Sequence, residues 1–471
     1  MKIVLIVPPS NNEITGNNPS IIEQERGHNP PLGLLYIAAY IQHYTSHQVK
    51  IIDAQLENLS ESQIQCRIRD ARPDIVGMTA MTLPLVDVYA LASLAKRVDP
   101  AVRLVLGGPH VFLYPHETLA NTDIDILVLG EGEITFAELA DTLSTGEDLA
   151  GVEGIAYRSG GKVILTPSRA RIENLDMLPF PARRLLPYQR YTSLLARRSP
   201  VTTMFTSRGC PFGCTFCARP HLGKKFRARS AANVVNEMEE CIALGINEFF
   251  IYDDTFTIDR NRVLDICNEI RKRKLSIGYD IRSRIDCMDE EMLKELKSTG
   301  CERIHYGIEA GTQKSLETLN KGITLEQVWK IIRATKKNGI STLAYFMIGI
   351  PGESREDILK TIAFSKKINP DFVHFTVLVP FPGTPVYAQA LKKGIFGHDR
   401  WKSFALSPQK EFKPPCFTES VSRKELEELL IVAYKSFYTR PGYILRQIFK
   451  TRSPEELGRK LHAGLKVIFM K

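Results

Sequence analysis

Short runs of β-branched and aliphatic residues alternate with amphipathic helical patterns over residues 1–145 of this 471-residue chain. The predicted strands are 2–7, 49–53, 75–79, 103–107 and 126–129. Strands that alternate with helices form parallel sheets covered by helices. The pattern therefore predicts an α/β fold that begins with a doubly wound, Rossmann-like domain over residues 1–150. Ligands of such domains bind beyond the carboxyl ends of the strands.

A second alternation begins at residue 201, with predicted strands at 201–205, 248–252, 277–281, 303–306, 341–347 and 372–378. Six strands are too few for a closed eight-stranded barrel, so a partial (β/α)6 barrel is expected over residues 196–395. Capping boxes are expected at Thr324 and Ser354. A predicted hairpin at 154–167 and a proline-rich stretch at 178–182 make 151–195 a linker. Residues 396–471 are expected to be helical.

The composition excludes several classes of protein. Hydrophobic residues make up 44% and charged residues 24%, which is ordinary for globular proteins and excludes global disorder. No apolar run reaches the ~18 residues of a spanning helix. Nine cysteines without a secretory signal favour a reducing cytoplasm as the location.

The positive charge is concentrated at the C-terminus. The net charge is +9, and residues 440–471, with eight lysines and arginines and two glutamates, carry most of it. The body of the chain therefore gives no indication of nucleic-acid binding.

An apolar stripe runs along the same tail, at Leu457, Leu461, Leu465 and Phe469. A basic amphipathic helix of this kind can lie in an anionic membrane interface. Packing against the barrel or another subunit is the alternative.

Three cysteines, Cys210, Cys214 and Cys217, lie within eight residues on a Gly/Pro-rich loop after the first strand of the barrel. Soft thiolate ligands suit an iron–sulfur cluster or zinc. Three ligands on a four-iron cluster leave one iron open for chemistry. A structural zinc site completed by His221 and unliganded core cysteines are the alternatives.

A Cys-x3-Cys-x2-Cys loop in this position resembles the radical S-adenosylmethionine (SAM) superfamily, over about residues 195–385. The resemblance implies that the three cysteines hold a 4Fe-4S cluster whose open iron chelates SAM. It also implies that one electron cleaves SAM to a 5′-deoxyadenosyl radical, with a donor such as flavodoxin or ferredoxin as partner.

The same resemblance assigns SAM-binding roles to residues at the strand ends. It implies contacts of Phe216 with the adenine, Asp253 and Asp254 with the amino group, Arg284 with the carboxylate and Glu309 with the ribose. Backbone and side chains at the adenine edge would come from Ile348, Gly349 and Pro351. The alternative for each residue is a structural contact, such as a turn or an ion pair.

The first domain resembles the cobalamin-binding domain that precedes many radical SAM enzymes. The resemblance implies cobalamin contacts at six residues: Thr79, Gly107, Gly108, His110, Gly130 and Glu131. A cobalt-binding histidine is not expected, because the place of the Asp-x-His-x-x-Gly motif reads Asp53-Ala-Gln-Leu-Glu-Asn58. His110 is expected to bond the corrin periphery instead. A domain without a cofactor and a plain nucleotide-binding domain are the alternatives.

The tail sequence Tyr438-Thr-Arg-Pro-Gly-Tyr443 resembles cobalamin-type radical SAM proteins near the anaerobic magnesium-protoporphyrin ester cyclases and hopanoid-modifying enzymes. That resemblance implies a methyltransferase-like enzyme acting on an unactivated carbon of an apolar or lipid-like substrate, in the cytoplasm or at the inner face of the membrane. A non-methylating radical cyclase or rearrangement enzyme is one alternative. A non-catalytic zinc-binding or interaction protein is the other.

Overall fold

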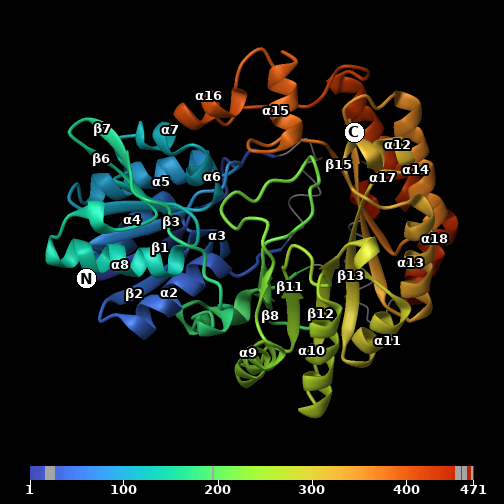
Figure 1. Cartoon of the computed structure of the whole chain (residues 1–471), viewed down its shortest axis with the longest axis horizontal. Helices are drawn as coiled ribbons and strands as arrows, with labels where there is room; N and C mark the ends of the chain where they lie inside the picture. The colour runs from blue at the N-terminus through green and yellow to red at the C-terminus, as the bar shows by residue number, and fades with distance from the viewer. Residues whose placement is uncertain (16–26, 194–195, 451–457, 459–463, 468–469, 471) are drawn as a thin grey trace.

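The computed structural model describes residues 1–15, 27–193, 196–450, 458, 464–467 and 470. Two α/β units lie side by side (Figure 1), the first in blue to teal and the second in green to orange. Each unit is built on its own sheet, and the two sheets contain the strands that the alternation in the sequence predicts. The predicted fold class is confirmed.

The first sheet has seven strands in the order β2-β1-β3-β4-β5-β6-β7. The five strands from β2 to β5 are parallel. Because the chain leaves β1 for β2 on one side and reaches β3 on the other, the strand order reverses between β1 and β3, the place where doubly wound sheets bind ligands. The strand bounds are β1 (Lys2–Val7), β2 (Gln48–Asp53), β3 (Ile75–Thr79), β4 (Arg103–Gly107) and β5 (Ile126–Val128).

The hairpin predicted within the linker is part of this sheet. Its strands, β6 (Ile155–Ser159) and β7 (Lys162–Leu165), add antiparallel to β5. Ile155 and Ala156 are buried in the core of the first unit, so the apolar side chains of β6 explain why the hairpin joins the sheet.

Helices cover both faces of the first sheet. Leucine and alanine side chains of α2 (Leu32–Tyr44) and α8 (Gly132–Thr145) fill the core on one face. The other face is covered by α4 (Glu61–Ala71), α5 (Leu85–Val98), α6 (Pro109–Leu113) and α7 (Pro115–Leu119). Short α3 (Ala54–Glu57) follows β2.

The second sheet is an open barrel of six parallel strands in the order β15-β14-β13-β12-β11-β8. Its outer face packs against helices, and both expected capping boxes are present, at Thr324 and Ser354. The strands are β8 (Val201–Met204), β11 (Glu248–Ile251), β12 (Gly278–Ser283), β13 (Cys301–Glu309), β14 (Ser341–Ile348) and β15 (Phe372–Val377). The helices are α9 (Ala231–Ala243), α10 (Arg260–Lys272), α11 (Glu290–Ser298), α12 (Gln313–Thr318), α13 (Leu325–Lys337) and α14 (Arg355–Ile368).

Two helices after the barrel return to the first unit, at the top of Figure 1: α15 (Pro385–Lys392) and α16 (Arg400–Leu406). Trp401 is fully buried in the core of the first unit, and its indole N–H donates to the carbonyl of Pro380 at 2.8 Å. The hydroxyls of Tyr114 and Tyr387 both donate to Asp399. This segment ties the two units together.

The exposed edge of β15 is covered by α17 (Arg423–Tyr438). The hydroxyl of Tyr434 accepts from the amide of Phe375 at 3.1 Å and donates to its carbonyl at 2.8 Å. Tyr438 makes the same two bonds to Val373, at 3.0 and 2.7 Å. The tyrosines therefore satisfy backbone groups that an edge strand would leave unpaired.

The Tyr438–Tyr443 stretch of the tail lies against the barrel. The Tyr443 hydroxyl donates to the carbonyl of Asp371 at 2.9 Å, and Arg440 donates to the carbonyl of Lys366 at 3.1 Å. Farther along, α18 (Pro441–Lys450) exposes four apolar side chains to solvent: Ile444, Leu445, Ile448 and Phe449.

Most of the predicted amphipathic stripe, Leu457, Leu461 and Phe469, lies outside the described residues, whereas Leu465 is described and exposed. Within the described part of the chain, no helix has the length and apolar character needed to cross a membrane.

Candidate active site

The cysteine loop starts from a short antiparallel ribbon at the end of β8. In this ribbon β9 (Ser207–Arg208) pairs with β10 (Arg227–Ala228), so the residues between them form a closed loop. Gly209 has φ +83°, and a Cβ at this position would lie 2.2 Å from the carbonyl oxygen of Lys225. Only glycine allows the loop to leave the ribbon in this way.

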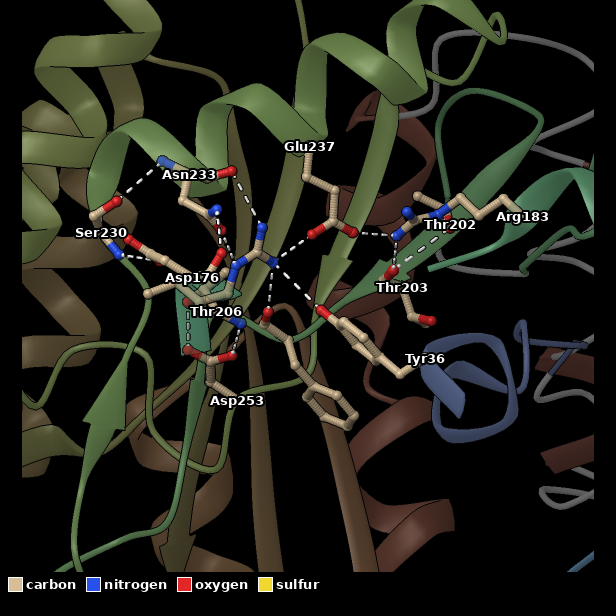
Figure 2. Close-up of polar contacts among 12 residues, drawn as sticks. Tyr36, Asp176, Arg183, Thr202, Thr203, Thr206, Ser230, Asn233, Glu237 and Asp253 are labelled. Carbon is tan, nitrogen blue, oxygen red and sulfur yellow. Dashed lines mark hydrogen bonds and ion pairs between the residues drawn. The ribbon is translucent and has the colours of Figure 1, made fainter. Parts of the chain in front are cut away.

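Asp253 anchors the start of this loop (Figure 2). Its carboxylate accepts from the Thr206 amide at 2.6 Å, the Thr206 hydroxyl at 2.5 Å and the Ser207 hydroxyl at 2.6 Å, and it is fully buried. The predicted contact of Asp253 with the SAM amino group therefore competes with three existing bonds. In this structure the carboxylate positions the cysteine loop.

A buried ionic network lies behind the same loop (Figure 2). Glu237 of α9 is fully buried and pairs with Arg229 and with Arg183, the latter at 2.5 Å. Burial by itself would raise the pKa of the Glu237 carboxyl, but the two guanidinium groups hold it below its ordinary value. Arg229 also donates to the Tyr36 hydroxyl at 3.4 Å, so the network connects the barrel to helix α2 of the first unit.

The three cysteine side chains share the loop and differ in exposure: Cys210 is buried, whereas Cys214 and Cys217 are partly exposed. Arg284 directs its guanidinium at Cys214, with 3.4 Å between Nη1 and Sγ. No group of three or more His, Cys, Asp or Glu among the described residues could hold a single metal ion, so the zinc alternative with His221 has no formed site. A 4Fe-4S cluster does not need such convergence, because each thiolate binds its own iron.

Arg284 was assigned to the SAM carboxylate, yet four of its five N–H donors already have partners. Besides Cys214, it pairs with Asp286 at 2.8 Å and donates to the carbonyl of Lys321, and its guanidinium stacks over the ring of Phe212. Arg284 thus supports the cysteine loop, and a SAM contact stays a prediction.

Phe216 and Glu309 are brought together by a residue that sequence reasoning missed. The ammonium of Lys321 lies 2.8 Å from the Glu309 carboxylate and 5.8 Å from the centre of the Phe216 ring. A bulge between Gly307 and Glu309 turns the end of β13, and Glu309 has φ +76°. Lys321 lies in a short polar segment after α12. No sequence pattern there indicates a site residue, so its role could not be predicted.

Asp254 faces the space between the two units. One carboxylate oxygen pairs with Arg219 at 2.8 Å, whereas the other, Oδ2, is buried and has no hydrogen-bond partner among the described residues. Burial raises the pKa of this carboxyl. An orphaned carboxylate oxygen next to the cysteine loop fits the ammonium group that SAM would present.

The turn after β14 contains the three residues assigned to the adenine edge. Glu353 closes this turn by accepting from the amides of Gly349 at 2.8 Å and Ile350 at 3.0 Å. Ile348 is buried in the barrel core, Gly349 has φ +77°, and Pro351 is partly exposed. Of these three residues only Pro351 is partly exposed, because Gly349 is buried against Leu426.

A cavity with about 1200 Å³ of empty space, including its open mouth, lies between the two units. Its first wall contains five of the six residues assigned to cobalamin, namely Thr79, Gly107, Gly108, Gly130 and Glu131. The opposite wall contains residues at and near the cysteine loop and the end of β11: Phe205, Ser207, Arg208, His221, Leu222, Tyr252 and Asp254. The part of this space that water-sized molecules can enter is about 300 Å³, at the lower end of the range for small-ligand pockets.

The first wall has the backbone exposure that a large flat ligand needs. A Cβ at Gly33 or Gly130 would meet nothing within 4 Å, so both glycines leave backbone open to the cavity. The cavity also extends between the sheet and helices α2 and α8, to Leu5, Gly77 and Phe136. Gly77 could have been found from the sequence, because a glycine inside a buried strand often marks a place where a ligand or another backbone segment approaches closely.

His110 does not line the cavity, so its expected contact with the corrin periphery has no support from the cavity and stays a prediction. It is fully buried beneath the loop after β4, and its Nδ1 bonds the Thr82 hydroxyl at 3.2 Å. Burial lowers its pKa to about 4, so the ring is neutral at pH 7. His110 belongs to α6, and its side chain lies on the buried side of this helix.

Glu131 lines the cavity but uses both carboxylate oxygens within the protein. It pairs with Arg208 and Arg227 of the β9–β10 ribbon, both at 2.7 Å. Arg208 also pairs with Glu133. Two carboxylates of the first unit thus hold the two arginines at the base of the cysteine loop, and Glu131 is a link between the units.

Two family models match the chain. The B12 binding domain matches residues 21–140, and the radical SAM superfamily matches residues 204–365. The sheet with a switch-point cavity and the open barrel with a three-cysteine loop correspond to these two matches. The fold and the site therefore define a radical SAM enzyme with a cobalamin-binding domain.

Full-length relatives support the same assignment. An uncharacterized methyltransferase of Pyrococcus horikoshii is 38% identical over 454 residues, which cover 96% of this chain and 95% of the relative. An anaerobic magnesium-protoporphyrin IX monomethyl ester cyclase of Rubrivivax gelatinosus is 30% identical, covering 89% of this chain and 75% of the relative. The chain belongs to the family of cobalamin-binding radical SAM enzymes.

Solved structures show the same fold at low identity. The cobalamin-dependent SAM radical enzyme OxsB, with aqua-cobalamin and SAM bound, is 18% identical, with a TM-score of 0.73 over 99% of this chain and 72% of that chain. The methyltransferase TsrM of Kitasatospora setae is 18% identical, with a TM-score of 0.69 over 91% of this chain and 84% of that chain.

Family membership identifies the cofactors as a 4Fe-4S cluster, SAM and cobalamin, and identifies the chain as an enzyme. The alternative of a non-catalytic zinc-binding or interaction protein is thereby set aside. The individual contacts to SAM and cobalamin remain predictions for the residues described above.

Proposed function

We propose that this enzyme replaces hydrogen by a methyl group on an unactivated carbon of a large, mainly apolar substrate. The observation that carries this proposal is the shared cavity, whose two walls come from the cobalamin-binding unit and from the cysteine loop. The bound cofactors supply hydrogen abstraction from one wall and a methyl group from the other. A substrate carbon between the walls would be in reach of both.

The chain's own residues hold the two walls in register. Glu131 and Glu133 pair with Arg208 two residues before Cys210, so the glycine-lined wall is linked directly to the cysteine loop. Trp401 and its neighbours make a second connection on the other side of the molecule. Rigid placement of the reacting groups lowers the entropic part of the barrier.

Cobalamin would lie against Thr79, Gly107, Gly108 and Gly130, which line the cavity. SAM would lie among Phe216, Asp254, Glu309 and the Gly349 turn. A flavodoxin or ferredoxin would supply the electron.

The exposed apolar side chains of α18, next to the basic tail, support a substrate or surface that is apolar and anionic. We therefore place the enzyme in the cytoplasm, in peripheral contact with the inner face of the membrane through α18 and the residues that follow it. Each cation near an anionic bilayer is worth about 1 kcal/mol.

Reconstituted enzyme incubated with methyl-labelled SAM and an extract of apolar metabolites tests the reaction. Label in an extracted product supports methyl transfer. Formation of 5′-deoxyadenosine with an altered but unlabelled product would support a radical cyclase or rearrangement enzyme, the second candidate that the Rubrivivax gelatinosus relative favours. Cys214→Ala is the negative control and should keep its fold but form no 5′-deoxyadenosine.

A further inference from the structure

The inner face of the barrel carries a row of polar and aromatic side chains from neighbouring strands. The row begins at Tyr252, directly after β11, and continues with Arg282, His305, Tyr345 and His374 of β12 to β15. All five are partly exposed, in contrast to the residues that alternate with them and pack against the outer helices. The inner face is thus accessible, and it adjoins the cavity at Tyr252.

Arg282 is the unusual member of this row. Its guanidinium stacks over the Tyr252 ring at 4.1 Å, and it has no hydrogen bond or ion pair to any described residue. The neighbouring cations are all paired, since Arg284 binds Asp286, Arg303 binds Asp280 and Lys321 binds Glu309. A guanidinium on an inner barrel face, held flat by an aromatic ring, is prepared for an oxyanion.

No neighbour among the described residues forms an ion pair with Arg282. His305, its partner in register on β13, bonds the Tyr345 hydroxyl at 2.9 Å and lies 3.4 Å from Asp280. Asp280 is in turn held by Arg303 at 2.6 Å, and Asp254, whose carboxylate interacts electrostatically with Arg282, forms its ion pair with Arg219. The guanidinium of Arg282 therefore keeps hydrogen-bond donors available for a ligand, next to Tyr252 in the cavity wall.

We propose that Arg282 binds an oxyanion of the substrate, a carboxylate or a phosphate, so that the substrate is an acidic amphiphile whose apolar part enters the cavity. This inference rests on the proposed function of the same site. The carboxylate of SAM is the other oxyanion that could reach Arg282, and the test separates the two sources.

The experiment uses inorganic phosphate as the probe and reconstituted, reduced enzyme without SAM, because the reduced cluster would cleave SAM. SAM affinity is measured separately on the oxidised enzyme. Reduced clusters are paramagnetic, so phosphate held near the site should show a broadened ³¹P resonance. We expect Arg282→Gln to weaken phosphate binding at least tenfold while SAM affinity, from calorimetry, changes less than twofold. Arg333→Gln, which removes an exposed arginine of α13, is the matched control and should behave like the parent.

Two results would overturn the proposal. Equal broadening in Arg282→Gln and parent would show that the phosphate does not use Arg282. A tenfold loss of SAM affinity in Arg282→Gln would assign the guanidinium to the SAM carboxylate. Arg282 bonds no other described side chain, so its removal leaves no unpaired partner and the variant should fold. Phosphate binding requires no methyl transfer, so failure here is distinguishable from failure of the labelled-SAM experiment.

Discussion

The guanidinium of Arg284 points at the sulfur of Cys214, with 3.4 Å between Nη1 and Sγ. This contact joins the cysteine loop to the end of β12, 70 residues further along the chain. Hydrogen bonds and positive charge at a cluster sulfur favour the reduced, more negative state.

Replacing Arg284 by Gln should therefore lower the reduction potential of the cluster. A tenfold effect on the equilibrium, about 1.4 kcal/mol, corresponds to about 59 mV for a one-electron couple. A redox titration followed by electron paramagnetic resonance measures this shift, with Arg333→Gln as control. An unchanged potential in a fully loaded Arg284→Gln cluster would contradict the assigned contact.

The pair of Glu309 and Lys321 gives a second prediction. If Glu309 binds the ribose, Glu309→Ala should weaken SAM binding by about 1.5–3 kcal/mol, the range for hydrogen bonds to a charged group. Equilibrium binding of SAM to reconstituted protein measures it. Glu317→Ala, an exposed position on α12, should leave the affinity unchanged. Full SAM affinity in Glu309→Ala would refute the ribose contact.

Glu353 gives a pH-dependent prediction for stability. Burial is the main cause that raises its pKa from the ordinary value of 4.5 to about 7. Between these values the folded chain holds a proton that the unfolded chain releases, so this group makes the free energy of unfolding fall as the pH rises from 4.5 to about 7. Gln at this position keeps an acceptor for the Gly349 and Ile350 amides but does not ionise.

Urea unfolding of parent and Glu353→Gln at pH 5, 6, 7 and 8 tests this. The stability difference should move in favour of Glu353→Gln by up to about 3 kcal/mol across the series. Glu317→Gln should show no such trend. A constant difference across the series would contradict the raised pKa.

The exposed face of α18 predicts attachment to anionic bilayers. Full-length protein should co-sediment with vesicles that contain phosphatidylserine, and should be released as the salt concentration rises. Changing Leu445 and Phe449 to Glu should reduce the bound fraction at least tenfold, since burying each side chain is worth about 1.5–3 kcal/mol. Leu165→Glu, on the distant hairpin, is the control. Unaltered sedimentation of the double variant would show that α18 is not the contact.

The sequence predicted the two sheets because their strands are marked by local runs of apolar residues, which do not depend on tertiary contacts. It placed the hairpin 154–167 in a linker because the pairing of β6 with β5 depends on contacts across the domain. It assigned the SAM carboxylate to Arg284, at the end of β12. The difference between Arg284 and Arg282 could not be predicted, because it depends on tertiary partners, Asp286 and Cys214, that only the fold brings to Arg284. The burial of His110 could not be predicted for the same reason, because helix packing decides which side chains are buried.

The spacing of the two tyrosines along α17 nearly equals the spacing of the backbone groups that they bond on β15. Residues four apart on a helix are separated by about 6 Å along its axis, and residues two apart on a strand by about 6.6 Å. Tyr434 can therefore hydrogen-bond to Phe375 while Tyr438 hydrogen-bonds to Val373, as the backbone of a seventh strand would. An uncovered strand edge is a template for pairing with other chains. By closing that edge with phenol groups, the enzyme can keep its barrel open toward a bulky substrate without becoming prone to aggregation.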